Sequence, residues 1–170
     1  MGKSLFLTVI YAVCSLCYMA AQGLVNVKHY SVKDGMSQNT VQGVLQDNEG
    51  YIWMATWNGL EKFDGYSFKN YKTYPTDKVK LQYNRLVNLQ LGGNQMLVCQ
   101  SYDRRVYLFD IRRECFEDVF AYHPEVKLCT AASKIITLPN GMVWIVGTNG
   151  DLWRIDCFRY KDKGGLVYLP

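Results

Sequence analysis

One pattern of tight turns and aromatic strands constrains this chain more than any other feature. It is most compact in the stretch IWMATWNGLEKFDGYSF, residues 52–68, where Asn58-Gly59 and Asp64-Gly65 interrupt the apolar run. Asp-Gly suits a two-residue hairpin, because a type I′ turn needs positive φ at both central residues. Two such breaks so close together predict consecutive antiparallel strands and not a helix.

The pattern occurs three times along the chain. Its copies occupy residues 51–71, 95–120 and 142–160, and each contains an apolar strand, a polar break, a strand that ends in Asp, and an aromatic strand. The closing aspartates are spaced by 46 residues, at Asp64, Asp110 and Asp156. A repeat of about 40 to 50 residues with four short strands per copy is typical of β-propeller blades.

The expected fold is therefore all-β, with about three four-stranded antiparallel blades. We place the blades at residues 36–74, 82–122 and 131–170, within a partial propeller that covers 22–170. A closed ring normally needs at least about four blades. We expect the chain to be the N-terminal piece of a longer protein whose remaining blades are its partners, and a short gene remnant is the alternative.

The first residues have the layout of a secretory signal peptide. Lys3 precedes an apolar run at residues 5–19, and Ala20-Ala21 follow it, which predicts a signal peptide over residues 1–21. The run is shorter than the roughly 20 apolar residues that a membrane-spanning helix needs. We therefore expect export of the mature chain, with an uncleaved N-terminal anchor as the alternative.

Charge and cysteines exclude some functions. The net charge is +4, and basic residues are scattered apart from the pairs at 104–105 and 112–113, so we expect no nucleic-acid binding. Sequence alone leaves three disulfide pairings open, although separate apolar contexts favour free thiols. His29 and His123 lack ligand-like spacing to the cysteines, so no metal and no cofactor is expected. The cysteines of the mature chain are Cys99, Cys115, Cys129 and Cys157.

Several repeated residues are interpreted as structural. The aspartates at 64, 110 and 156 occupy the same place in successive copies, and a catalytic residue would more often be unique to one blade. Trp53 and Trp144 lie on second strands, where neighbouring blades pack, and Gly65 completes a turn. The acids fall mostly at turns, and no catalytic motif is present, so we expect no catalysis by this segment.

Two stretches resemble a known family. YSVKDGMSQNTV (residues 30–41) and DNEGYIWMATWNGLEKFDGYSF (47–68) look like the two-component regulator propeller repeat, found in the periplasmic sensors of Bacteroides-type hybrid two-component systems. The resemblance is strong over 25–71 and moderate over 142–156. It is weak in the second copy, where residues 101–105 replace the usual Gly-containing turn and leave that turn's geometry open.

The resemblance implies a large signalling protein. Family members carry two propellers, an immunoglobulin-like domain, a membrane helix, a histidine kinase, a receiver and a DNA-binding helix-turn-helix domain. Many sense oligosaccharides and switch on polysaccharide-utilisation genes. This chain would then be periplasmic, anchored through the full-length protein in the inner membrane and a homodimer when full length. Residues 25–31 would be the strand that closes the last blade.

The alternatives are a secreted glycan- or protein-binding propeller without a kinase, and a polysaccharide-active propeller enzyme. For a binding function, the loops from strand two to strand three are the expected site, because propeller ligands usually meet loops at one end of the axis. Aromatic faces would stack on a sugar and an Arg would suit an acidic one; the opposing interpretation is that Trp57 packs on the next blade and the arginines are solvated. The candidates are Trp57, Asn58, Tyr102, Arg104, Arg105 and Asn149.

Overall fold

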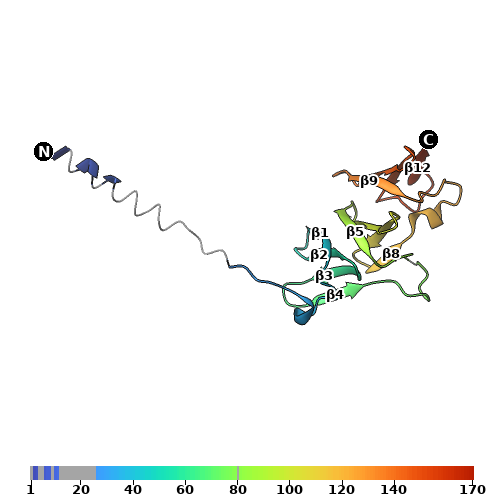
Figure 1. The fold of residues 1–170 in the computed structure, drawn as a ribbon. Coiled ribbons are helices and arrows are strands. Elements are labelled where there is room, and N and C mark those ends of the chain that lie inside the picture. Colours follow the sequence, from blue (N-terminus) through green and yellow to red (C-terminus); the bar gives the residue numbers. More distant parts are fainter. Residues whose placement is uncertain (1, 4–5, 9, 12–25, 80) are drawn as a thin grey trace.

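The chain folds into three four-stranded antiparallel sheets, each with its strands in chain order (Figure 1). The structure is a computed structural model that describes residues 2–3, 6–8, 10–11, 26–79 and 81–170. The predicted all-β blade architecture is confirmed, because every sheet is one copy of the repeat.

The strands of the first blade are β1 (Val41–Gln46), β2 (Ile52–Thr56), β3 (Gly59–Phe63) and β4 (Phe68–Tyr71). Those of the second are β5 (Leu86–Leu91), β6 (Met96–Ser101), β7 (Val106–Asp110) and β8 (Cys115–Glu117). Those of the third are β9 (Ala132–Thr137), β10 (Met142–Gly147), β11 (Leu152–Asp156) and β12 (Leu166–Leu169). Two short 3-10 helices complete the described elements, η1 (Val32–Asp34) and η2 (Val119–Tyr122).

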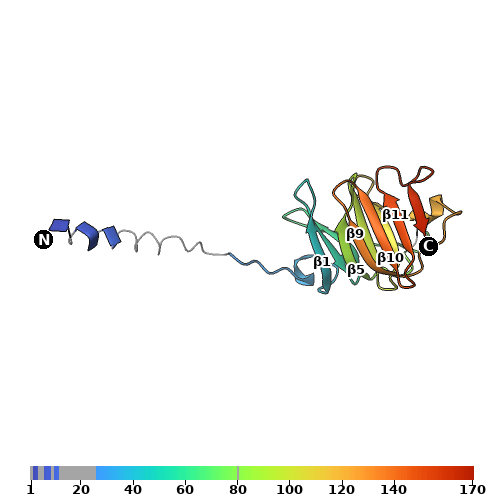
Figure 2. The same cartoon turned by 90° about the horizontal axis from the view of Figure 1, so that it is seen from above.

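The blades stack face to face, and the middle blade is buried on both faces. Successive side chains of a strand point to opposite faces. On β6, Leu97 and Cys99 therefore join the core shared with the first blade, while Met96 and Val98 join the core shared with the third. Figure 2 shows the first strands β1, β5 and β9 side by side along one edge of the stack. The two cores hold the three sheets together.

Each first strand carries a bulge at the same place. The pairing register with the second strand shifts after Val41 on β1, after Leu86 on β5 and after Ala132 on β9. A bulge adds local twist and bends the strand. The bulge at the same position of all three blades therefore gives the three first strands a similar bend.

The repeated aspartates shape the turns between third and fourth strands. Asp64 Oδ1 accepts the backbone N–H of Tyr66 and of Ser67, at 2.8 and 2.7 Å. The Ser67 N–H, followed by that of Tyr66, holds the pKa of Asp64 below its ordinary value. Gly65 takes φ 98° within this turn, a backbone conformation that favours glycine.

The other two aspartates make the same type of turn. Asp110 Oδ1 accepts the N–H of Arg112 and of Arg113, and Asp156 Oδ1 accepts that of Phe158. An Asp side chain that bonds the backbone two residues on mimics a backbone turn. The 46-residue spacing is therefore the spacing of a repeated turn.

Trp53 links the first blade to the second. Its ring is fully buried, with ring centroids 5.4 Å from Phe109 and 5.7 Å from Tyr71. Its Nε1 donates to Asp47 Oδ2 at 2.7 Å. Trp144 lies on the face of β10 opposite to Val143, which faces the second blade, and is half-buried there. Whether a further blade packs on Trp144 stays a prediction.

The segment before β1 lies on the outer face of the first blade. The Tyr30 ring packs on Phe63 and Phe68, at centroid distances of 4.9 and 5.5 Å. The backbone N–H of Ser37 donates to the buried carboxylate of Glu61. Residues 26–31 form no strand here, and a closing strand would need a last blade to pair with. The prediction for 25–31 is therefore untested.

The predicted signal peptide lies largely outside the described residues, and cleavage after Ala21 stays a prediction. In the part of the chain that is described, no helix is both long and apolar enough to span a membrane. All four cysteines of the predicted mature chain are free thiols. Burial raises the pKa of Cys129 and of Cys157 to about 11, so these two thiols are poor nucleophiles.

At the outer rim, Glu114 of the second blade binds two groups of the first. Its carboxylate lies 2.5 Å from Lys69 Nζ and accepts the hydroxyl of Tyr71 at 2.6 Å. The Lys69 ammonium, followed by the Tyr71 hydroxyl, holds the pKa of Glu114 below its ordinary value of 4.5. The Lys69–Glu114 ion pair between the blades therefore requires this carboxylate to be charged.

Replacing Asp47 with alanine should destabilise the fold by about 2 to 3 kcal/mol, because the buried Trp53 Nε1–H would lose its acceptor. Asp47 Oδ1 also accepts the N–H groups of Glu49 and Tyr51. Urea denaturation followed by tryptophan fluorescence measures the change. Glu49→Ala, in the same turn at an exposed side chain, is the control and should stay within about 0.5 kcal/mol of wild type. Equal effects of the two changes would contradict this role for Asp47.

The stability gap between wild type and Glu114→Gln should depend on pH. A carboxylate whose pKa is lower in the folded state stabilises the fold at pH values above its unfolded-state pKa. That stabilisation is lost as the pH falls through the folded-state pKa. The difference in unfolding free energy between wild type and Glu114→Gln should be largest at pH 7 and should decrease below about pH 4.5. Urea denaturation across this range checks it, with Lys69→Met expected to give the same trend. A gap that does not change with pH would refute the assignment.

Candidate functional site

The turns after the second strands share one backbone geometry. In each blade the first turn residue donates its N–H to the carbonyl of the residue just before the first strand. The pairs are Trp57 with Thr40 at 3.4 Å, Tyr102 with Arg85 at 2.8 Å, and Thr148 with Ala131 at 3.1 Å. Trp57 and Tyr102 are therefore equivalent positions on consecutive blades.

The second blade keeps this turn without its glycine. The third turn residue is Gly59 in the first blade and Gly150 in the third, with φ of 111° and 91°. Arg104 holds the same position in the second blade with φ 65°. The turn at residues 101–105, whose geometry the sequence left open, thus has the same geometry as the turns of the other two blades. Its positive φ costs a non-glycine residue about 1 to 2 kcal/mol of conformational energy. Arg104 is exposed at this end of the molecule.

The guanidinium of Arg85 contacts both of the equivalent aromatic rings. Its guanidinium carbon is 3.5 Å from the Trp57 ring centroid and 4.4 Å from that of Tyr102. Both rings keep an open surface, with 42% of Trp57 and 59% of Tyr102 exposed. The first blade supplies one ring, and the second supplies the cation and the other ring. Cation–π contact of this kind is worth about 0.5 to 2 kcal/mol.

The other predicted residues have mainly local partners. Asn58 donates its N–H to Thr56 Oγ1, and its carbonyl accepts the amide of Asn70, so it shapes the turn. Arg105 Nε lies 3.4 Å from Asp103 Oδ2. These two candidates therefore do not contribute to the Arg85 cluster, which consists of Arg85, Trp57 and Tyr102.

Asn149 belongs to a separate network on the third blade. Its Nδ2 donates to Asp151 Oδ2 at 2.7 Å, and Asp151 also binds Lys127. Lys127, as the main cause, holds the pKa of Asp151 below its ordinary value. Of the six predicted residues, Trp57 and Tyr102 are those that meet one cation.

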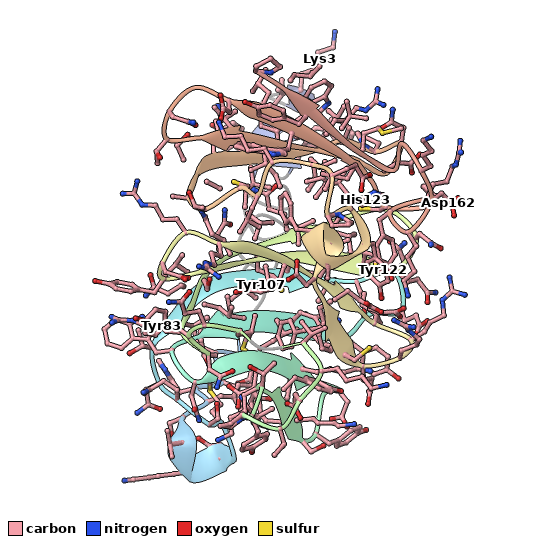
Figure 3. All side chains as sticks on the ribbon, turned by 90° about the vertical axis from the view of Figure 1, so that its right-hand side faces the viewer. Lys3, Tyr83, Tyr107, Tyr122, His123 and Asp162 are labelled. Atoms are coloured by element: carbon pink, nitrogen blue, oxygen red, sulfur yellow. The ribbon has the colours of Figure 1, made fainter. Side chains whose placement is uncertain are left out.

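Sequence reasoning missed Arg85. No motif marks it, since it stands in the loop sequence QYNR before β5. Its position just before a first strand was the available signal. In each blade the carbonyl of that residue accepts the N–H of the first residue of the turn after the second strand. The nearby Tyr83 is 51% exposed, and Figure 3 shows it at the edge of the molecule opposite to Asp162.

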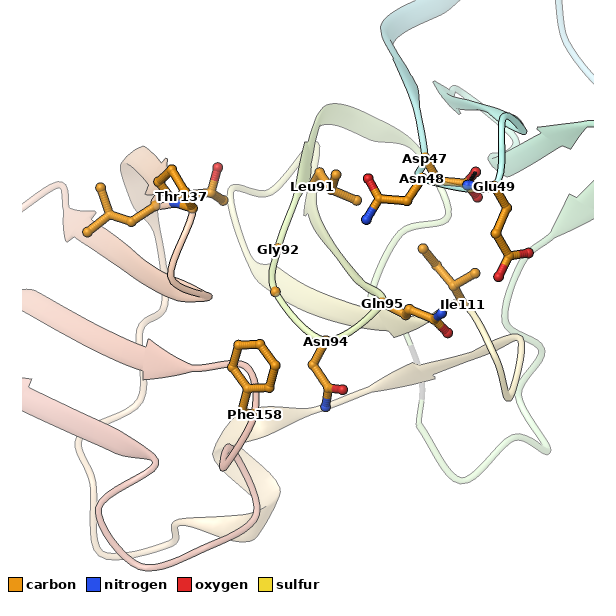
Figure 4. Close-up of a pocket in the computed structure, with 13 residues that line it drawn as sticks. Asp47, Asn48, Glu49, Leu91, Gly92, Asn94, Gln95, Ile111, Thr137 and Phe158 are labelled. Carbon is orange, nitrogen blue, oxygen red and sulfur yellow. Dashed lines mark hydrogen bonds between the residues drawn. The ribbon is translucent and has the colours of Figure 1, made fainter.

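A cavity of about 510 Å³ lies among the turns between first and second strands (Figure 4). Leu91, Thr137 and Phe158 are among its lining residues. The Asp47 carboxylate at its edge is already occupied by Trp53 and the backbone, and Asn94 Oδ1 accepts from Arg112. Within the described residues, no group of three or more His, Cys, Asp or Glu is placed to hold a metal ion.

No family profile matches the chain. "Histidine kinase P4" of Formosa agariphila is 32% identical over 76 residues, which is 45% of this chain and 6% of that protein. The extracellular domain of the putative one-component system BT4673 of B. thetaiotaomicron has a similar fold, with a TM-score of 0.55 and 23% identity. The match covers 80% of this chain and 16% of that one. The three blades therefore share their fold with part of that extracellular domain.

A second solved structure of BT4673, described as a putative hybrid two-component system, agrees. Its TM-score is 0.55 at 22% identity, and the match covers 79% of this chain and 16% of that one. The resemblance seen in the sequence is thus confirmed by the fold and by a matching histidine kinase. The chain spans only a small part of each of these relatives.

Arg104→Gly should stabilise the fold by about 1 kcal/mol, because glycine adopts positive φ without strain. Thermal or urea denaturation measures the change. Arg105→Gly, one residue on and without positive φ, is the matched control and should destabilise slightly. A destabilised Arg104→Gly variant would contradict the equivalence of the three turns.

Proposed function

We propose that the chain is the N-terminal part of the periplasmic ligand-sensing propeller of a hybrid two-component sensor histidine kinase. The similarity to a histidine kinase and to the extracellular domains of putative one- and two-component systems supports this proposal. In the full-length protein, further blades, the membrane anchor and the signalling domains complete the sensor, which acts as a homodimer. This segment binds and does not catalyse.

The ligand in this proposal is an oligosaccharide whose presence regulates polysaccharide-utilisation genes. The observation that carries it is the pair of exposed rings, Trp57 and Tyr102, held at equivalent positions on consecutive blades around Arg85. Rigid aromatic faces beside a few polar groups are the usual lining of small-molecule sites. Binding across two blades favours one arrangement of the sensor dimer and so shifts its population.

Trp57→Ala and Tyr102→Ala should each weaken oligosaccharide binding at least about tenfold, which corresponds to 1.4 kcal/mol. Isothermal titration of the exported chain with oligosaccharides from plant, algal and animal glycans measures this. Tyr66→Ala is the matched control, because Tyr66 is 96% exposed and lies on a β3–β4 turn at the other end of the blade. Equal loss in all three variants, or no binding of any oligosaccharide, would refute the proposed site.

A further inference from the structure

We infer that the ligand is acidic, and that Arg85 receives its carboxylate or sulfate group. The inference rests on the proposed function for the sugar part of the ligand. For the anion it rests on the charge and contacts of Arg85.

Arg85 is a cation without a counter-ion among the residues that the structure describes. Three other arginines have carboxylate partners, Arg105 with Asp103, Arg113 with Asp110 and Arg159 with Asp162. Among the arginines without an ion pair to a described residue, Arg85 is the one whose Nε is also buried without a partner. Arg85 makes no ion pair and no side-chain hydrogen bond with any described residue, and its Nε is buried without a partner. The half-buried guanidinium therefore has its charge available for an anion from outside, and charge-assisted pairs of this kind are among the strong hydrogen bonds.

The two rings leave one direction open for that anion. Trp57 and Tyr102 both contact the guanidinium, and its Nε is buried. The terminal nitrogens remain as the donors open to a ligand. They form the planar fork that binds carboxylate or sulfate oxygens in pairs.

The surrounding charges favour an anion at this place. Arg104 is exposed on the adjacent turn and forms no ion pair with a described residue. Asp103, the acid of the same turn, is held by the Ser101 hydroxyl at 2.5 Å and by Arg105. The local charge is therefore positive, and an incoming carboxylate meets no free acid of the turn.

An acidic sugar offers both parts that the cluster needs. A uronate or a sulfated sugar carries an anionic group beside an apolar ring face, and here the cation stands between two aromatic faces. Carboxylate and sulfate share this chemistry, so the two sources are separated by experiment.

The test compares matched acidic and neutral probes on the exported chain. The probes are oligouronates from alginate and polygalacturonate, the same oligomers after reduction of their carboxyl groups, and sulfated galactan oligomers before and after desulfation. Wild type should bind at least one acidic set ten times or more tightly than its neutral counterpart. The set that binds identifies carboxylate or sulfate as the group received.

Arg85→Met should abolish this preference, because methionine fills the space between the rings without charge. Arg85→Lys should restore part of it, since lysine keeps the charge and lacks the fork. Arg159→Met is the matched control at the other end of the molecule and should keep the full preference. A preference that survives Arg85→Met, or equal binding of acidic and neutral probes, would overturn the inference and leave the sensing proposal standing.

A second readout separates the two proposals. Titration with glucuronate, glucose and sulfate, followed by the NMR signal of the Arg85 side-chain N–H, reports the anion site alone. A shift with glucuronate or sulfate but not with glucose, in a chain that binds no oligosaccharide, would retain the anion site and reject sugar sensing. No shift with either anion and no binding of any oligosaccharide, acidic or neutral, would reject both.

Discussion

The face-to-face packing of the blades is the constraint on which the rest of the structure depends. A four-stranded sheet of short strands buries too little apolar surface alone, and a repeat unit becomes stable by covering its neighbour. The middle blade meets this requirement on both faces, with odd and even positions of β6 assigned to different cores. Each turn between strands is then fixed in space by its blade, and turns of consecutive blades are brought to the same end.

The candidate site is a consequence of this packing. Trp57 belongs to the first blade, and Arg85 and Tyr102 belong to the second, so the guanidinium contacts both rings only when the two blades are stacked. A ligand that binds there contacts two blades at once, which couples binding to their relative position. Arg104 adds to this picture, because a strained non-glycine backbone persists where the surrounding structure holds it in place, and such residues cluster at functional sites.

Much of the fold could be predicted from the sequence, because Asp-Gly turns and the 46-residue spacing of three aspartates specify repeated antiparallel strands. Trp57 and Tyr102 could be chosen as candidates because they follow second strands. Arg85 was missed, because its place just before a first strand marks only a turn contact, and the contact between blades that gives it a role is encoded by no local pattern. The geometry of the turn that contains Arg104 could not be predicted for a related reason. Sequence preference favours glycine at this position, and tertiary packing overrode that preference.

A crystal structure of the chain with its tightest-binding acidic oligosaccharide tests the central claim most directly. The account predicts the acidic group at hydrogen-bonding distance, about 2.7 to 3.2 Å, from the terminal nitrogens of Arg85, with the sugar beside Trp57 or Tyr102. A ligand seated instead in the cavity beside Phe158, with Arg85 free of contact, would contradict it.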